Sequence, residues 1–234
     1  MNKRKKTILL KITGETLPRA DQGLDGSILE KLAFQVKQLR ATHRFGVVMG
    51  GGNFFRGARP GKITLSANVG HSVGMLATAM NGLIIQDIFQ QSGISTHLFT
   101  ASHGGTIGDE LSPQNLDTAL AEKECLIFAG GSGNPYITTD TTAVIRALQI
   151  GASEIWKGTN VNGIYSEDPR KNTLARLLPQ VRYEDAVKNR YAVMDLTAFT
   201  LAEQYKVPLR VFNIFKDEAL LQAAQDPSFG STVF

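Results

Sequence analysis

Residues 47–57 read VVMGGGNFFRG, a run of β-branched and apolar residues that ends in three glycines. The apolar run predicts a buried strand, and glycines directly after a strand indicate that something comes very close to the backbone. Three explanations are open: a phosphate group, another backbone segment, or only a tight turn. The segments on either side of this loop provide the context for choosing between them.

Short apolar runs alternate with helical patterns on both sides of the glycines. We predict strands at 7–13, 45–50, 95–101, 125–130, 153–159 and 208–214, and helices at 27–42, 72–93, about 113–122, 141–151, 196–206 and 216–225. Such alternation implies crossover connections between parallel strands. The expected fold class is therefore α/β, a three-layer αβα sandwich with a mainly parallel central sheet. The irregular stretches 52–70, 102–112 and 160–182 are candidate substrate loops.

The composition is that of an ordinary soluble globular protein. Of the 234 residues, 42% are hydrophobic and 20% charged, and the formal net charge of +4 is modest. Cys125 is the single cysteine and lies in an apolar run, so we expect a buried small hydrophobic residue rather than a nucleophile. We find no signal peptide, no stretch long and apolar enough for a membrane span, and no nucleic-acid-binding motif. We expect a cytoplasmic protein without nucleic-acid or membrane partners.

Three turns that follow predicted strands carry glycine or charge. They are KITGE (11–15), GGGNFFRG (50–57) and GGSGNPYITTD (130–140). The carboxyl ends of parallel strands form the ligand crevice of such a sheet, so the three turns should converge on one edge. Glycine backbone N–H groups, the ammonium of Lys11 and the guanidinium of Arg56 suit a phosphate ligand. Asp140 has two readings: a helix N-cap, or a group that holds a magnesium–nucleotide or orients a lysine.

Two common nucleotide-binding signatures are missing from the sequence. Neither the G-x-x-x-x-G-K-[ST] pattern nor the G-x-G-x-x-G fingerprint occurs. Histidines and cysteines also lack metal-ligand spacing, so we expect no metal site built from protein ligands. The phosphate-binding hypothesis therefore requires another kind of kinase or nucleotide-binding fold.

The segments LLKITGE, GVVMGGGNFFRG, GMLATAMNGL, GGSGNPYITTDTTA, GIYSEDP, VMDLTAFTLA and PLRVFNI occur in this order from about residue 6 onward. Together they resemble bacterial uridylate (UMP) kinases of the amino acid kinase superfamily. The resemblance implies a single amino acid kinase (carbamate kinase-like) domain over 1–234. Its acceptor-binding and phosphate lobe would cover about 1–150, and its ATP-binding lobe about 151–234. It also implies phosphoryl transfer from ATP to UMP with Mg²⁺, and a homohexamer.

Site residues follow from the same resemblance, motif by motif. Lys11, Arg56, Asp140 and Asp195 are implied as catalytic residues. ATP binding is implied for Lys11, Thr13, Gly14, Gly52, Arg56, Thr159, Tyr165 and Asp168. UMP binding is implied for Gly51, His71, Ser132, Gly133, Asn134, Pro135, Tyr136, Ile137, Thr138 and Thr139. From position alone, Asp195 could equally cap the helix that starts at Leu196, and Tyr165 could be a core aromatic residue.

The sequence departs from the family pattern on the acceptor side. His71 stands where the family usually has an aspartate, and Ala67 where it often has an arginine. Two alternatives to UMP phosphorylation are therefore open: a diverged paralogue that phosphorylates another small acceptor, and a non-catalytic nucleotide-binding oligomer. The outer residues of the 72–93 helix, including Leu76 and Met80, favour core or subunit packing rather than ligand binding.

Overall fold

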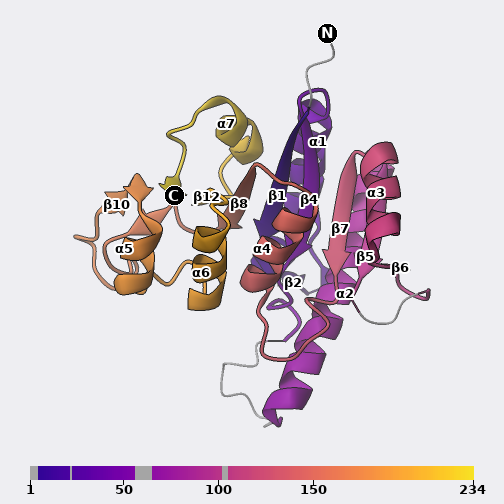
Figure 1. Ribbon diagram of the computed structural model, residues 1–234, viewed down its shortest axis with the longest axis horizontal. Helices are drawn as coiled ribbons and strands as arrows, with labels where there is room; N and C mark the ends of the chain where they lie inside the picture. Colours follow the sequence, from indigo (N-terminus) through magenta and orange to yellow (C-terminus); the bar gives the residue numbers. More distant parts are fainter. Residues whose placement is uncertain (1–4, 22, 56–64, 102–104) are drawn as a thin grey trace.

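The computed structural model describes residues 5–21, 23–55, 65–101 and 105–234, and it has the expected three-layer architecture (Figure 1). The strands are β1 (Lys6–Ile12), β2 (Arg19–Ala20), β3 (Gly23–Leu24), β4 (His43–Met49), β5 (Thr96–Thr100), β6 (Asp109–Glu110), β7 (Cys125–Ala129), β8 (Glu154–Thr159), β9 (Ile164–Tyr165), β10 (Leu177–Leu178), β11 (Gln180–Val181), β12 (Leu209–Asn213) and β13 (Ser231–Val233). The helices are η1 (Gly14–Thr16), α1 (Ser27–Leu39), α2 (Ala67–Gln91), α3 (Pro113–Glu122), α4 (Thr139–Gln149), α5 (Tyr183–Lys188), α6 (Leu196–Gln204) and α7 (Ala219–Gln225).

Nine of these strands form one sheet in the order β11-β13-β12-β8-β1-β4-β7-β5-β6. Within it, only the β12–β13 pair is antiparallel among the pairings of the described residues. The predicted fold class, α/β with a mainly parallel sheet, is thus confirmed. Chain order reverses at β1, which pairs with β4 on one side and β8 on the other. In sheets of this kind, ligands bind beyond the carboxyl ends of the strands at such a reversal.

Alternate side chains of each central strand enter two different cores. On β1, Ile8, Leu10 and Ile12 pack with α1, α2 and α7, whereas Leu9 packs on the other side with α3 to α6. Trp156 is 1% exposed and lies in the first core. Cys125 is also fully buried there, and burial raises the pKa of its thiol, which confirms the expected inert role.

The predicted strands and long helices all occur, with small differences at their ends. The largest difference is in α2, which was expected to begin at residue 72 and begins at Ala67. Its predicted stop is confirmed, because Gly93 adopts a left-handed φ of 80° and the Ile94 N–H donates back to Phe89 O. The expected irregular stretches 102–112 and 160–182 contain short strands, β6 and β9 to β11. Strands this short carry too few residues for a period to be read.

Helix α2 also corrects the expectation that no stretch is apolar enough to cross a membrane. By length and composition alone it could, since its most apolar window has a mean hydropathy of 1.3. In the fold, however, its inner face packs on the sheet through residues such as Ile85 and Phe89. Figure 1 shows its N-terminal part projecting beyond the carboxyl ends of the strands. The high hydropathy thus belongs to a helix that covers a sheet and leaves an apolar outer face.

Candidate active site

Two lysines lie side by side at the point where chain order reverses. Lys11 on β1 and Lys157 on β8 are register partners in a parallel pair, so their backbones are about 4.8 Å apart. Both lie near the carboxyl ends of their strands, and both are almost fully buried. Their strands alternate so that Leu9 and Ile155, two positions earlier, face the α4 side of the sheet. Both ammonium groups are therefore directed toward the start of α4.

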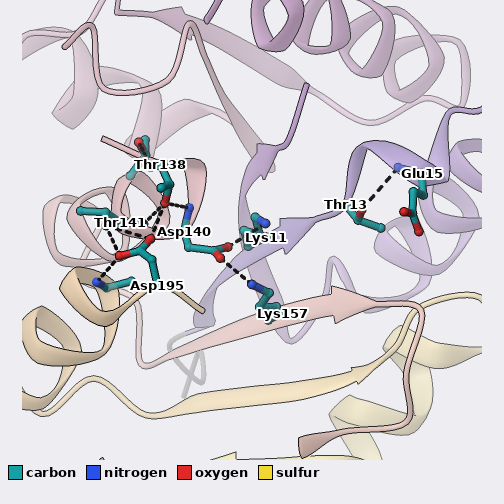
Figure 2. A network of polar contacts seen from close by, with 10 residues as sticks. Lys11, Thr13, Glu15, Thr138, Asp140, Thr141, Lys157 and Asp195 are labelled. Atoms are coloured by element: carbon teal, nitrogen blue, oxygen red, sulfur yellow. Dashed lines mark hydrogen bonds and ion pairs between the residues drawn. The ribbon is translucent and has the colours of Figure 1, made fainter. Parts of the chain in front are cut away.

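The carboxylate of Asp140 forms ion pairs with both lysines (Figure 2). Its Oδ1 lies 2.7 Å from Lys11 Nζ, and its Oδ2 lies 2.7 Å from Lys157 Nζ. The N-cap reading of Asp140 is wrong, because Thr138 is the N-cap of α4 and its hydroxyl accepts from the N–H groups of Asp140 and Thr141. Asp140 is instead the second residue of the helix, which leaves its carboxylate to bridge the two ammonium groups.

The electrostatics of this triad are strongly coupled. Burial alone would raise the pKa of Asp140, but the charges of Lys11 and Lys157 lower it to about 2. Burial, together with the nearby charge of Lys11, lowers the pKa of Lys157 to about 8 against the opposing pull of Asp140. At neutral pH the triad carries two positive charges and one negative charge. It can therefore attract an anion while keeping both cations in fixed positions.

The glycine loop after β4 packs backbone to backbone against its neighbours. A Cβ on Gly14 would lie 2.8 Å from Gly50 O and 2.9 Å from Gly52 N, so the turn after β1 rests directly on the loop. On the other side, a Cβ on Gly51 would lie 2.7 Å from Ala77 Cβ and 3.0 Å from Gly74 O of α2. The neighbours seen close to the glycines are thus other parts of the chain. The loop is layered between η1 and α2.

Asp195 lies beside the start of α4. It is the N-cap of α6, accepting from the N–H of Ala198 at 2.9 Å, so the capping alternative is confirmed. Its carboxylate also accepts from the hydroxyls of Thr141, at 3.0 Å, and Thr138 (Figure 2). The side chain therefore ties the start of α6 to the start of α4, through two residues that flank Asp140 in the sequence.

The segment 132–139, expected to bind the acceptor, runs from the turn after β7 to the first residue of α4. It has its own internal bonds, such as Ser132 Oγ accepting from the N–H of Asn134 at 3.1 Å. Tyr136 is 63% exposed and holds a left-handed φ of 67°, a conformation that costs a non-glycine residue about 1 kcal/mol or more. Its ring contacts that of His71 on α2, with 4.7 Å between the centroids. The two expected acceptor-side segments thus meet through an aromatic contact.

The positions expected to hold adenosine lie on the β8 side. Thr159 ends β8, and Tyr165 is half-buried on β9, where it pairs with Leu177 in the β9–β10 hairpin. Asp168 is in an exposed turn of that hairpin and accepts from the N–H of Arg170 at 3.0 Å, which lowers its pKa. These contacts of Tyr165 and Asp168 all lie within the β9–β10 hairpin.

One contact links this side to the phosphate turn. Asn160 Nδ2 donates to Glu15 Oε2 at 2.7 Å, joining the loop after β8 to η1. Thr13, the expected ATP contact beside it, is the N-cap of η1. The two loops that follow the carboxyl ends of β1 and β8, the strands that carry the two lysines, are therefore joined by a side-chain hydrogen bond.

Sequence reasoning missed Lys157, and one expected residue lies outside the described ranges. Arg56, expected among the catalytic and ATP-binding residues, belongs to the undescribed segment 56–64. Lys157 was read only as part of a strand, although a signal existed. A lysine inside a buried apolar strand requires a charged partner. SEIWKGT has such a lysine near the end of its predicted strand, as LLKIT does.

Within the described ranges, no group of three or more histidine, cysteine, aspartate or glutamate side chains could hold a metal ion. Both oxygens of Asp140 face lysines instead.

Sequence comparison places this geometry among known proteins. A model of the amino acid kinase family matches residues 6–213. The uridylate kinase of Actinobacillus succinogenes is 40% identical over 230 residues, which is 97% of each chain. The uridylate kinase of Pasteurella multocida is 42% identical over 218 residues, covering 92% of this chain and 90% of that protein.

Solved structures agree with the sequence comparison. The crystal structure of UMP kinase from Ureaplasma parvum superposes with a TM-score of 0.92 at 31% identity, covering 98% of this chain and 99% of the other. That of UMP kinase from Bacillus anthracis superposes with a TM-score of 0.89 at 26% identity, covering 98% and 96%. The similarity extends over whole chains rather than over one motif.

Proposed function

The chain belongs to the amino acid kinase family, and from this membership we propose that it is a uridylate kinase. It transfers the γ-phosphoryl group of Mg–ATP to UMP, giving ADP and UDP. The relatives described above carry that name over nearly the whole of both chains. The observation that carries the proposal is the Lys11–Asp140–Lys157 triad, because two fixed cations at the carboxyl edge match the charge requirement of phosphoryl transfer.

The reaction proceeds by direct in-line transfer. A phosphate oxygen of UMP forms the new bond to the γ-phosphorus, while the bond from that phosphorus to the β–γ bridging oxygen breaks and its electron pair leaves on ADP. The attacking oxygen is already ionised, so no general base is required. Lys11 and Lys157 neutralise charge on the transferring group, and Asp140 keeps them correctly spaced. Catalysis is then positioning plus charge neutralisation.

The remaining assignments extend the family resemblance to individual residues. Thr13, Gly14 and Gly52 are proposed to contact the phosphates of ATP, and Thr159, Tyr165 and Asp168 its adenosine. UMP is proposed to lie along Gly51, His71 and the segment 132–139. Arg56 is proposed to act on the charge between the two substrates. Asp195 acts through Thr138 and Thr141 on the start of α4.

Magnesium enters this scheme as part of the substrate. Mg²⁺ commonly binds proteins through one or two carboxylates together with substrate phosphates. Because Lys11 and Lys157 already engage Asp140, we propose that the ion is held chiefly by the phosphates of ATP. The ion would neutralise part of the negative charge of the phosphates, and the two lysines would neutralise another part.

The lobes and the assembly follow the family as well. We propose an acceptor and phosphate lobe over about 1–150, an ATP lobe over about 151–234, and a cytoplasmic homohexamer. An apolar stripe on the outer face of α2 supports subunit contacts. Its members, each 41–48% exposed, are Val69, Leu76, Met80 and Leu83. A stripe of this kind on a solvent-facing helix is typical of a protein interface.

Release of ADP from Mg–ATP tests the function directly. The purified protein is assayed with UMP, CMP, AMP, GMP or no acceptor, and Asp140→Asn serves as the inactive control. The proposal expects UMP to give the fastest turnover and the acceptor-free reaction to be negligible. Faster turnover with another acceptor would identify a diverged paralogue, and no turnover with any of them would indicate a nucleotide-binding protein.

A further inference from the structure

Asn53 and Asn81 form a reciprocal amide pair beneath the glycine loop. Asn53 Nδ2 donates to Asn81 Oδ1 at 3.0 Å, and Asn81 Nδ2 donates to Asn53 Oδ1 at 2.9 Å. Asn81 lies on the inner face of α2 and is completely buried. A buried amide is costly unless its donors and acceptors are paired, and here the two side chains pair with each other.

The second hydrogen of each amide reaches a backbone carbonyl. Asn81 Nδ2 donates to Gly50 O at 2.8 Å, at the start of the glycine loop. Asn53 Nδ2 donates to Leu17 O at 3.1 Å, at the C-cap of η1. The pair therefore joins three segments: the loop after β4, the turn after β1, and helix α2. Each of its hydrogen bonds is directional, so it specifies orientation as well as distance.

The same three segments are layered through glycine contacts. Gly14 of η1 rests on the backbone of Gly50 and Gly52, and Gly51 rests on Gly74 and Ala77 of α2. These contacts limit how closely the layers approach, but van der Waals contact between backbones does not prevent sliding. The amide pair adds a side-chain restraint against sliding, because sliding would break bonds to both Gly50 O and Leu17 O.

We propose that Asn81, paired with Asn53, is a positioning residue that fixes the two phosphate turns relative to each other and to Lys11. This inference rests on the proposed kinase function for its catalytic consequence. Lys11 is the last residue but one of β1, the strand that leads into η1, and Gly50 N–H donates to Ile12 O at 3.1 Å, so a shift of either turn displaces the triad. Catalysis that depends on positioning is sensitive to displacements of about 1 Å, which can reduce the rate about 100-fold.

The experiment compares Asn81→Ala, Asn81→Asp, Asn53→Ala and the double variant Asn53→Ala/Asn81→Ala. Asn115→Ala is the matched control, because the Asn115 amide also donates to a backbone carbonyl, Glu110 O at 3.0 Å, but lies on α3. Thermal unfolding first establishes that each protein is folded at the assay temperature. Steady-state kinetics then give kcat and KM for UMP and ATP, and hydrogen–deuterium exchange reports on segments 12–18 and 47–55.

We expect kcat to fall about 10- to 100-fold in either single variant, with KM for both substrates changed much less. The double variant should be no slower than the slower single variant, because both substitutions remove the same restraint. Asn81→Asp, which keeps the shape but replaces the donor to Gly50 O by an acceptor, should be at least as slow as Asn81→Ala. Exchange in both segments should rise together in every variant except the control.

Several results would overturn the inference. In a folded Asn81→Ala protein, kcat within twofold of the Asn115→Ala control would show that the pair does not position the reacting groups. Losses that multiply in the double variant would show that the two residues act separately. Unchanged exchange in both segments would refute the restraint itself, whatever the activity. A wild-type protein without kinase activity would instead refute the proposed function, and exchange would still decide whether the pair holds the two turns together.

Discussion

Lys11 and Lys157 occupy the same register position on adjacent strands, and both bind the carboxylate of Asp140. Two like charges at this spacing would repel each other in a buried site, so the arrangement depends on Asp140 between them. The consequence is a positive site that is rigid before any ligand arrives. The pKa of Lys157 is lowered to about 8, so the protonation state of Lys157 determines the charge of the site near that pH.

The pH dependence of kcat/KM should show this control. As pH rises through about 8, Lys157 in the free enzyme loses its proton, the site loses a positive charge, and kcat/KM should fall. In Lys157→Arg the guanidinium stays protonated, so any activity that remains should lack this alkaline limb. The measurement is kcat/KM for Mg–ATP from pH 6 to 10. An identical limb in the arginine variant would assign it to another group.

Replacing Asp140 tests the bridge between the lysines. Asp140→Asn should lower kcat by about 10²- to 10³-fold, because the two ammonium groups lose the carboxylate that spaces them. It should also lower the free energy of unfolding at neutral pH by about 3–5 kcal/mol, since one partner of a buried ion pair is removed. Denaturant unfolding measures the second effect. A variant as stable as the wild type would mean that the lysines find other partners.

Acid unfolding provides a separate test of the same carboxylate. The folded-state pKa of Asp140 is about 2, below the ordinary value of 3.8. Its stabilising contribution is therefore complete above about pH 4 and is lost as pH falls toward 2. The stability difference between the wild type and Asp140→Asn should shrink over this interval. A constant difference from pH 5 to pH 2 would contradict the assigned pKa.

The backbone layering makes Gly14 intolerant of a side chain. Gly14→Ala should destabilise the fold by about 1–3 kcal/mol and reduce activity, because its Cβ would lie within 3 Å of Gly50 O and Gly52 N. Gly74→Ala is the control, since a Cβ there meets nothing within 4 Å and alanine favours a helix. Thermal unfolding of the two variants should therefore move in opposite directions.

The acceptor side offers a gain-of-function prediction. His71→Asp should lower the KM for UMP several-fold with little change in kcat, because hydrogen bonds from nucleoside hydroxyls to a charged carboxylate are stronger than those to an uncharged acceptor. His71→Ala separates the new carboxylate from simple loss of the Tyr136 contact. If both variants raise the KM equally, the His71–Tyr136 contact itself supports UMP binding.

The outer face of α2 predicts assembly. Leu76→Glu/Met80→Lys should reduce the molar mass measured by light scattering, because it places charge in the apolar stripe. Leu174→Glu alters a residue that is 82% exposed in the loop between β9 and β10, and should leave the mass unchanged. An unchanged mass in the α2 variant would locate the subunit contact elsewhere.

Periodicity in the sequence was sufficient to predict the layers and the edge at which the turns meet. Long segments such as 72–93 repeat over many residues, whereas β6 and β9 to β11 are too short to show a period. Lys11 and Asp140 stood out because each adjoins a glycine-rich turn. Lys157 did not, because its role depends on its register with β1, and register is a property of strand pairing rather than of local sequence.

The amide pair shows the same limit more sharply. Asn53 follows the triple glycine and Asn81 lies within an apolar helix, and no local pattern connects them. Their relationship exists only because α2 crosses under the loop at the height of Asn81. For Asp195, position alone left capping and catalysis open, and the structure shows that the side chain caps α6 while bonding to α4.

The layering of Gly14, the glycine loop and α2 has a consequence for protein engineering. Because backbone is packed on backbone, the positions of Gly14 and Gly51 leave almost no room for a side chain. A library that varied them would consist mostly of destabilised proteins. His71 and the exposed part of 132–137 have side chains that can be exchanged without disturbing that stack. Efforts to change which molecule is phosphorylated should therefore vary those positions and keep the glycines unchanged.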